Sequence, residues 1–193
     1  MKIKEINRMV VKIGSSLLID KDKGVNNNFL NNISEDILSL KKRGIETLVV
    51  SSGAIELGKI ELDKTKEKFN LAESQAASSI GQIKLINSWK ESLSKFDLNA
   101  AQILITAEDT ENRKRFLNAR STIEELLREK YIPIINENDT VATSEIRYGD
   151  NDRLAARIAG MVAADCLILL SNVEGLYESC LLYTSPSPRD RLK

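Results

Sequence analysis

Short apolar runs alternate with longer amphipathic stretches along this chain. The runs rich in valine, isoleucine and leucine predict strands at 9–13, 45–51, 101–106, 131–135 and 166–171. The amphipathic stretches predict helices at 29–43, 71–96, 112–130 and 153–164. Because the strands are apolar on both faces and separated by helices, they predict a mostly parallel sheet that is covered on each side. The expected fold class is α/β, with binding loops at the carboxyl ends of the strands.

Several segment ends carry their own signals. Gly44 follows the basic turn 41–43, as expected of a glycine that ends a helix. Asn112 is placed to cap the helix that follows it. The charged segment 63–68 predicts an exposed loop or helix end, and the small-residue turn 51–54 leads into a further helix-like segment.

The composition fits one domain with a balanced surface charge. A chain of 193 residues with 42% hydrophobic content is long enough for one core and short for two. The 28 basic and 28 acidic side chains cancel, which disfavours a nucleic-acid partner. The sequence has no apolar run of about 18 residues and no secretory signal peptide. We therefore expect a cytoplasmic protein without a membrane partner.

The residue types present restrict the chemistry. Histidine is absent, which excludes Ser-His-Asp and Cys-His catalysis and most zinc sites. Cys166 lies in an apolar run and Cys180 in a polar tail, so the cysteines form neither a disulfide framework nor a metal-ligand pattern. Carboxylates, lysines, arginines and backbone amides remain, and no metal-ligating residues are predicted.

Two predicted strands end in residues suited to binding anions. Lys12 lies inside the first apolar run and Gly14 follows it; a glycine lets a phosphate approach the backbone, and a lysine supplies a positive charge. The alternative is a lysine that reaches solvent from an edge strand. Ser52 lies in the turn before the helix-like segment, where backbone amides bind anions. The alternative there is an ordinary serine cap.

The polar loop 136–152 follows the fourth predicted strand, at a position where α/β sheets bind ligands. Asp139 and the run 150–152 predict a polar pocket, although one residue of that run would suffice to cap the next helix. The spacing of residues 53–60 is that of a P-loop, but Ile60 stands where a magnesium-binding hydroxyl is required, so a P-loop is disfavoured.

Five motifs, in order and at family spacing over about residues 8 to 177, resemble the amino acid kinase family, and within it the members that phosphorylate glutamate. They are Val-Val-Lys-Ile-Gly-Ser-Ser at 10–16, Ser-Ser-Gly-Ala-Ile at 51–55, Arg-Phe-Leu-Asn-Ala-Arg at 115–120, Ile-Asn-Glu-Asn-Asp at 135–139 and Gly-Asp-Asn-Asp at 149–152. No single motif is decisive, but the set is highly specific.

The resemblance implies a three-layer αβα sandwich and a kinase activity. The reaction would transfer the γ-phosphoryl group of ATP to the side-chain carboxylate of L-glutamate, giving L-glutamyl 5-phosphate in the first step of proline biosynthesis. It also implies Mg²⁺ as a cofactor, proline as a candidate feedback inhibitor and a homo-oligomer at full length. The residue inventory agrees, because a carboxylate nucleophile is already an anion at neutral pH and needs no general base.

By the same resemblance, catalytic and substrate-binding roles fall on residues from three motifs. Lys12 would contact the transferring phosphoryl group, and Asp152 would orient Lys12. Glutamate would be held by Ser52, Asp139 and Asn151.

Nucleotide binding would involve Lys12, Gly14, Ser171 and Asn172. The family usually has threonine and aspartate where Ser171 and Asn172 stand, and it continues with further strands and a glycine-rich loop that bears a second phosphate-binding lysine.

The carboxyl-terminal residues depart from the family pattern. We expect a kinase domain at 1–178 whose nucleotide-binding half is incomplete, so that this fragment would be inactive. The segment 179–193 contains two of the three prolines and resembles translated sequencing adapter, which predicts a foreign or disordered tail. Two alternatives remain open at this point: a family member acting on aspartate, acetylglutamate, carbamate or a nucleotide, and a non-catalytic module that senses amino acids.

Overall fold

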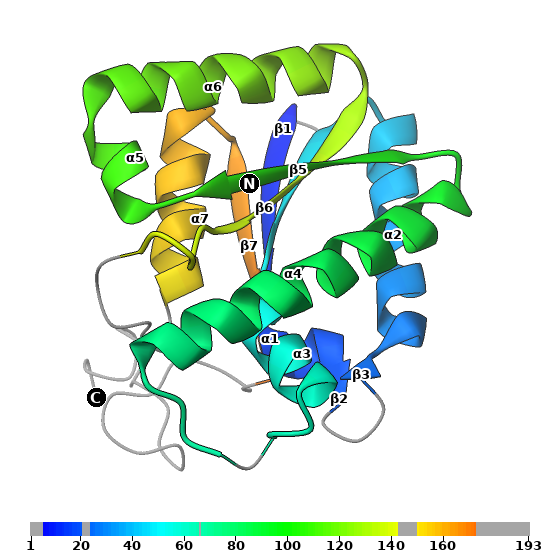
Figure 1. Cartoon of the computed structure of the whole chain (residues 1–193). Coiled ribbons are helices and arrows are strands. Elements are labelled where there is room, and N and C mark those ends of the chain that lie inside the picture. Colours follow the sequence, from blue (N-terminus) through cyan, green and yellow to red (C-terminus); the bar gives the residue numbers. More distant parts are fainter. Residues whose placement is uncertain (1–5, 21–23, 66, 143–149, 173–193) are drawn as a thin grey trace, which may run out of the picture.

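The computed structural model describes residues 6–20, 24–65, 67–142 and 150–172. Its centre is a five-stranded parallel sheet in the order β5-β6-β4-β1-β7 (Figure 1). The strands of this sheet are β1 (Arg8–Ile13), β4 (Glu46–Ser51), β5 (Asn99–Ile105), β6 (Tyr131–Glu137) and β7 (Cys166–Leu170). The other elements are α1 (Ser15–Leu18), β2 (Ile19–Asp20), β3 (Gly24–Val25), α2 (Asn27–Lys42), α3 (Ala54–Glu61), α4 (Leu71–Ser94), α5 (Ala107–Glu111), α6 (Arg113–Arg128) and α7 (Asp150–Met161).

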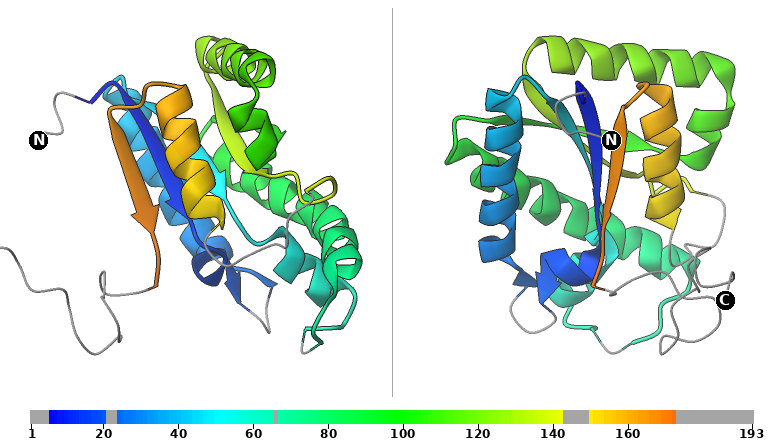
Figure 2. Two further views of the ribbon diagram at one scale, coloured as in Figure 1. Left: turned by 90° about the vertical axis from the view of Figure 1, so that its left-hand side faces the viewer. Right: turned by 180° about the vertical axis from the view of Figure 1, so that it is seen from behind.

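Helices cover both faces of the sheet, which makes three layers (Figure 2). Strand residues alternate between the two faces, so Val11 and Val49 join the core beneath α2, α3 and α4, whereas Val10 and Val50 join the core beneath α6 and α7. The predicted α/β class and parallel sheet are therefore confirmed. This alternation also decides which polar residues at the strand ends meet α4 and which meet α7.

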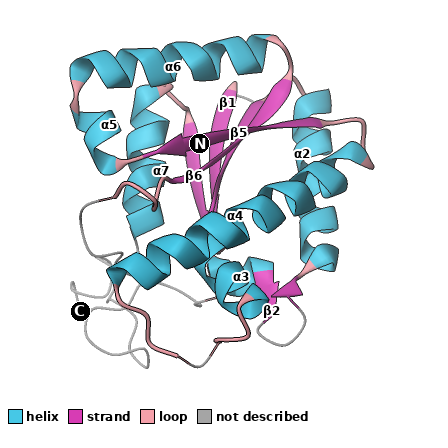
Figure 3. Ribbon diagram, in the orientation of Figure 1, coloured by secondary structure: helices cyan, strands magenta, loops and turns pink. Residues whose placement is uncertain are grey.

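All five strands of the predicted sheet are present, and most helices agree to within a few residues (Figure 3). Gly44 adopts a positive φ of 77° after α2, and the Asn112 side chain caps α6 by accepting hydrogen bonds from Lys114 and Arg115. The predicted start of the last helix near Arg153 is wrong, because α7 begins at Asp150. Acidic and amide residues are typical of loops, but they are also favourable in the positively polarised first turn of a helix.

The P-loop spacing noted in the sequence does not form a loop. The chain enters α3 directly after Gly53, and Gly58 and Lys59 lie inside this helix. Gly58 instead allows α3 and α4 to touch: a Cβ added to Gly58 would lie 1.8 Å from the carbonyl oxygen of Ala77. The equivalent position on α4 is Gly81, where a Cβ would lie 1.9 Å from the carbonyl oxygen of Ala54.

Parts of two expectations lie outside the described residues. The segment 179–193 and Cys180 belong to this undescribed part, as do residues 143–149 of the polar loop. Within the described residues, none of the helices combines the length and the apolar character needed to cross a membrane.

Candidate active site

Lys12 and Asp152 form an ion pair between the central strand and α7. Lys12 shares the strand face of Val10, which packs beneath α7, so its side chain points to the first turn of that helix. The Lys12 amine lies 2.7 Å from Asp152 Oδ1, and the two side chains are 12% and 47% exposed. The contact does not have the geometry of a hydrogen bond, and Oδ1 has no hydrogen-bond partner among the described residues. The amine is held by charge attraction and can still donate to an incoming oxygen.

Gly14 keeps space open beside the Lys12 amine. Its backbone N–H donates to the carbonyl oxygen of Leu170 at 3.3 Å, which brings the ends of β1 and β7 together. A Cβ at Gly14 would lie 3.6 Å from Lys12 Nζ, in van der Waals contact, so an added side chain would occupy space beside the amine. Ser171 and Asn172 follow β7 and are exposed at this edge. The predicted nucleotide-binding residues therefore lie at the carboxyl ends of adjacent strands.

Ser52 and Asn151 form the second pair of the site. Ser52 shares the strand face of Val50 and meets α7, where Asn151 Nδ2 donates to Ser52 Oγ at 2.6 Å. Asn151 Oδ1 is buried and has no hydrogen-bond partner among the described residues. A buried acceptor without a donor is costly, so this atom is suited to a donor supplied by a ligand.

The amides before α3 are only partly available for an anion. The backbone N–H of Ser52 donates to the carbonyl oxygen of Ile13 at 3.3 Å. The anion contact expected from this N–H is therefore replaced by a bond within the sheet. Gly53 follows with a φ of 110° and stands at the amino terminus of α3, where helix amides favour negative charge.

Asp139 lies against α4 rather than α7. It is 8% exposed, and its Oδ2 accepts a hydrogen bond of 2.6 Å from Ser78 of α4. Asp139 also lines a pocket of about 290 Å³ together with Ser78, Gln82, Gln102 and Glu137. None of the described lining residues is basic. The pocket is therefore suited to a group that carries positive charge.

The structure groups the predicted residues into two sets. Lys12, Asp152, Ser52 and Asn151 meet along the first turn of α7, whereas Asp139 is held by α4. Sequence reasoning missed the α4 residues that hold the Asp139 segment, although their spacing was a signal. They are Gln75, Ser78, Ser79 and Gln82, which recur on one helix face at intervals of three and four residues.

Sequence reasoning also missed how the end of β4 is fixed. Ser51 faces α4, and its Oγ accepts a hydrogen bond of 3.0 Å from the indole N–H of Trp89, which is fully buried. This bond fixes the residue immediately before Ser52. A buried tryptophan needs a partner for its N–H, but the sequence does not show which residue supplies it.

The fold and site define an α/β protein in which Lys12 and Gly14, at the end of the central strand, share the first turn of α7 with the hydrogen-bonded pair of Ser52 and Asn151. The amino acid kinase family model matches residues 7–180, so the chain belongs to the amino acid kinase family.

Curated relatives narrow this similarity further. The chain is 58% identical over 170 residues to a protein from Rhizobium rhizogenes named glutamate 5-kinase, which covers 88% of this chain and 44% of the relative. It is 57% identical over 171 residues to the protein of that name from Agrobacterium fabrum, covering 89% of this chain and 44% of the relative. It is 53% identical over 188 residues to glutamate 5-kinase 1 from Mesorhizobium japonicum, a match that covers 97% of this chain and 48% of the relative. The chain therefore spans about half the length of the relatives it matches.

Proposed function

We propose that this chain carries the glutamate-binding part and the beginning of the nucleotide-binding part of an ATP-dependent glutamate 5-kinase. One observation carries the proposal. The consecutive residues Asn151 and Asp152 contact Ser52 and Lys12 respectively, at 2.6 Å and 2.7 Å. The first turn of α7 thus contributes to two contacts. The contact of Asn151 with Ser52 is suited to an acceptor substrate, and the contact of Asp152 with Lys12 is suited to a phosphoryl group. The names of the relatives support glutamate as the acceptor.

Phosphoryl transfer to a carboxylate requires that the two substrates are aligned and that the charge on the transferring phosphoryl group is neutralised. The side-chain carboxylate of glutamate attacks the γ-phosphorus of ATP, a carboxylate-to-phosphorus bond forms, and ADP leaves with the electrons of the broken bond. No proton is removed from the nucleophile, so the absence of histidine from the sequence is no obstacle. Lys12 neutralises charge on the transferring group, and Asp152 keeps the lysine directed at it.

Three residues are proposed to hold the acceptor. Asp139 would bind the α-ammonium group of glutamate through charge-assisted hydrogen bonds. Asn151 Oδ1, which has no hydrogen-bond partner in the described part of the chain, would accept a hydrogen bond from the substrate, and Ser52 would donate to one of its carboxylates. The α-carboxylate would lie near Gly53 at the start of α3.

ATP is proposed to lie along the ends of β1 and β7. Gly14 leaves room for a phosphate beside Lys12, and the exposed Ser171 and Asn172 follow at the same edge. Mg²⁺ would enter bound to the phosphates, because ions of this type are commonly held by substrate phosphates and few protein ligands. Among the described residues, no cluster of three carboxylate or cysteine ligands offers a separate metal site.

The wider properties implied by the family are also proposals. We propose a cytoplasmic enzyme that forms a homo-oligomer at full length and is inhibited by proline. Among the described residues, β5 forms an edge of the sheet and Ile83 on α4 is 65% exposed, and both features support self-association. Light scattering of the full-length protein tests for the homo-oligomer. A kinase assay with and without proline tests for inhibition.

Calorimetric titration of the chain with L-glutamate tests the binding half of the proposal. We expect saturable binding, and we expect Asn151→Leu to weaken it by at least roughly tenfold, because a polar contact to a charged ligand is lost. Asn118→Leu, an exposed position on α6, serves as the matched control and should bind normally. Trapping the acyl phosphate product with hydroxylamine then tests for phosphoryl transfer. Wild-type chain that fails to bind L-glutamate would refute the proposed function.

A further inference from the structure

A row of polar side chains on α4 holds the segment that carries Asp139. Gln82 Oε1 accepts from Asn136 at 2.7 Å, Ser79 shares a hydrogen bond of 3.2 Å with Thr140, and Gln75 donates to the Ala142 carbonyl oxygen at 3.1 Å. The helix residues descend in number as the segment residues rise, so the segment runs antiparallel to α4. The segment is thus held at several points by one rigid helix.

Ser78 is the central member of this row and the one that touches the carboxylate. Ser78 is 3% exposed and Asp139 is 8% exposed, so their hydrogen bond of 2.6 Å is shielded from water. A hydrogen bond from a hydroxyl to a carboxylate is stronger when both groups are shielded from water. The Ser78 bond therefore fixes the position of the Asp139 carboxylate more firmly than the same bond at an exposed site would.

The same helix is fixed relative to the Ser52 turn. Gly81 lies three residues after Ser78 on the same face of α4 and contacts the backbone of Ala54, which begins α3 directly after Gly53. Any shift of α4 would move Asp139 relative to Ser52. Backbone contact between α3 and α4 therefore sets the separation of the two parts of the site.

We propose that Ser78 is a positioning residue that holds the Asp139 carboxylate where it meets the α-ammonium group of the amino-acid substrate. The inference rests on the proposed function, because it assumes that Asp139 binds this ammonium group. Ser78 acts through Asp139 and makes no contact with the reacting atoms. It follows that Ser78 governs selectivity for substrates that carry an α-ammonium group over those that lack one.

The test compares L-glutamate with glutarate, which has the same two carboxylates and lacks the ammonium group. Calorimetry gives the affinity of wild type and of Ser78→Ala for L-glutamate. The affinity for glutarate is measured by its competition with L-glutamate. We expect Ser78→Ala to weaken L-glutamate binding roughly tenfold and to leave glutarate binding unchanged, on the scale of one hydrogen bond to a charged group. Ser88→Ala is the matched control, since the Ser88 hydroxyl donates to the Lys84 carbonyl oxygen of its own helix. It should change neither affinity.

A second variant covers the case in which Ser78→Ala does not fold. Ser78→Cys keeps the shape of the side chain but is a weak donor, so we expect a smaller loss that is again confined to L-glutamate. Equal losses for both ligands, or no loss in either variant, would overturn the role of Ser78 while leaving glutamate binding intact. If the wild-type chain binds glutarate but not L-glutamate, the proposed substrate and the role of Ser78 both fail.

Discussion

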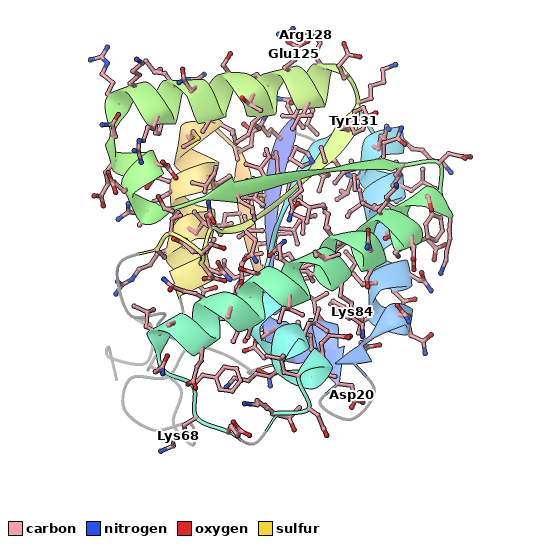
Figure 4. The ribbon with its side chains drawn as sticks, in the orientation of Figure 1. Asp20, Lys68, Lys84, Glu125, Arg128 and Tyr131 are labelled. Carbon is pink, nitrogen blue, oxygen red and sulfur yellow. The ribbon has the colours of Figure 1, made fainter. Side chains whose placement is uncertain are left out.

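Lys12 is the residue on which the proposed chemistry depends most. In any form of the protein that phosphorylates glutamate, we expect Lys12→Met to lower turnover by roughly 10²–10³, the scale for removing one electrostatic contact to the transition state. The KM for glutamate should change little, because Lys12 meets the phosphoryl group. Steady-state kinetics check both values. Lys84→Met is a suitable control, since Lys84 lies on the outer surface of α4 (Figure 4). Unchanged turnover in Lys12→Met would remove the role given to this residue.

At this scale the sequence identified Lys12 as a candidate phosphate-binding residue but did not show which face of the sheet it occupies. A lysine among apolar strand residues has two faces available, and the position of Val10 beneath α7 decides which one Lys12 takes. Ser78 was not predicted, because the spacing that it shares with Gln75, Ser79 and Gln82 indicates a polar helix face but not which segment that face contacts. Its role becomes visible only when Asp139, distant in sequence, meets it in the fold.

At the scale of elements, the contact between α3 and α4 is the tightest helix packing near the site. We expect Gly81→Ala to destabilise the protein by about 3 kcal/mol, since its Cβ would overlap the Ala54 carbonyl oxygen and backbone atoms cannot move aside as side chains do. Gly160→Ala on α7 is the control. Its Cβ meets nothing within 4 Å, so the change should be neutral or stabilising by up to about 1 kcal/mol. Urea unfolding of both variants measures the difference. Equal free energies of unfolding for the two variants would show that α3 and α4 can move apart without loss of stability.

The long elements were predictable and the short ones were not. A 24-residue helix such as α4 contains several repeats of its period, whereas α1 has four residues and α5 has five, too few for a period to appear. Strand order was also beyond the sequence, because β7 pairs with β1 although they are far apart along the chain. This pairing is what brings Ser171 to Gly14.

At the scale of the whole molecule, Arg8 ties the sheet to the helices at the end opposite the site. Its guanidinium donates to Glu46 at the start of β4, to both carboxylate oxygens of Glu124 on α6, and to the carbonyl oxygen of Val162 after α7. The hydrogen bonds from Arg8 lower the pKa of the Glu124 carboxyl against the opposing effect of burial. Backbone N–H groups of Arg8 and Asn7 likewise lower the pKa of Asp165.

These lowered pKa values predict that the fold loses stability in acid. A carboxyl whose folded pKa lies below its unfolded pKa stabilises the fold above the unfolded value, about 4.3 for glutamate, and loses this contribution as the pH falls through the folded pKa. Glu124→Gln should therefore lower the free energy of unfolding near neutral pH by about 0.5–1 kcal/mol, a figure reduced for solvent screening. Urea unfolding at about pH 7 and about pH 3 measures this. The difference between wild type and variant should shrink at the lower pH, because the contribution of Glu124 starts to be lost once the pH falls below the unfolded pKa. A difference that stays constant with pH would mean that the carboxylate charge contributes nothing and that the Arg8 cluster acts through packing alone.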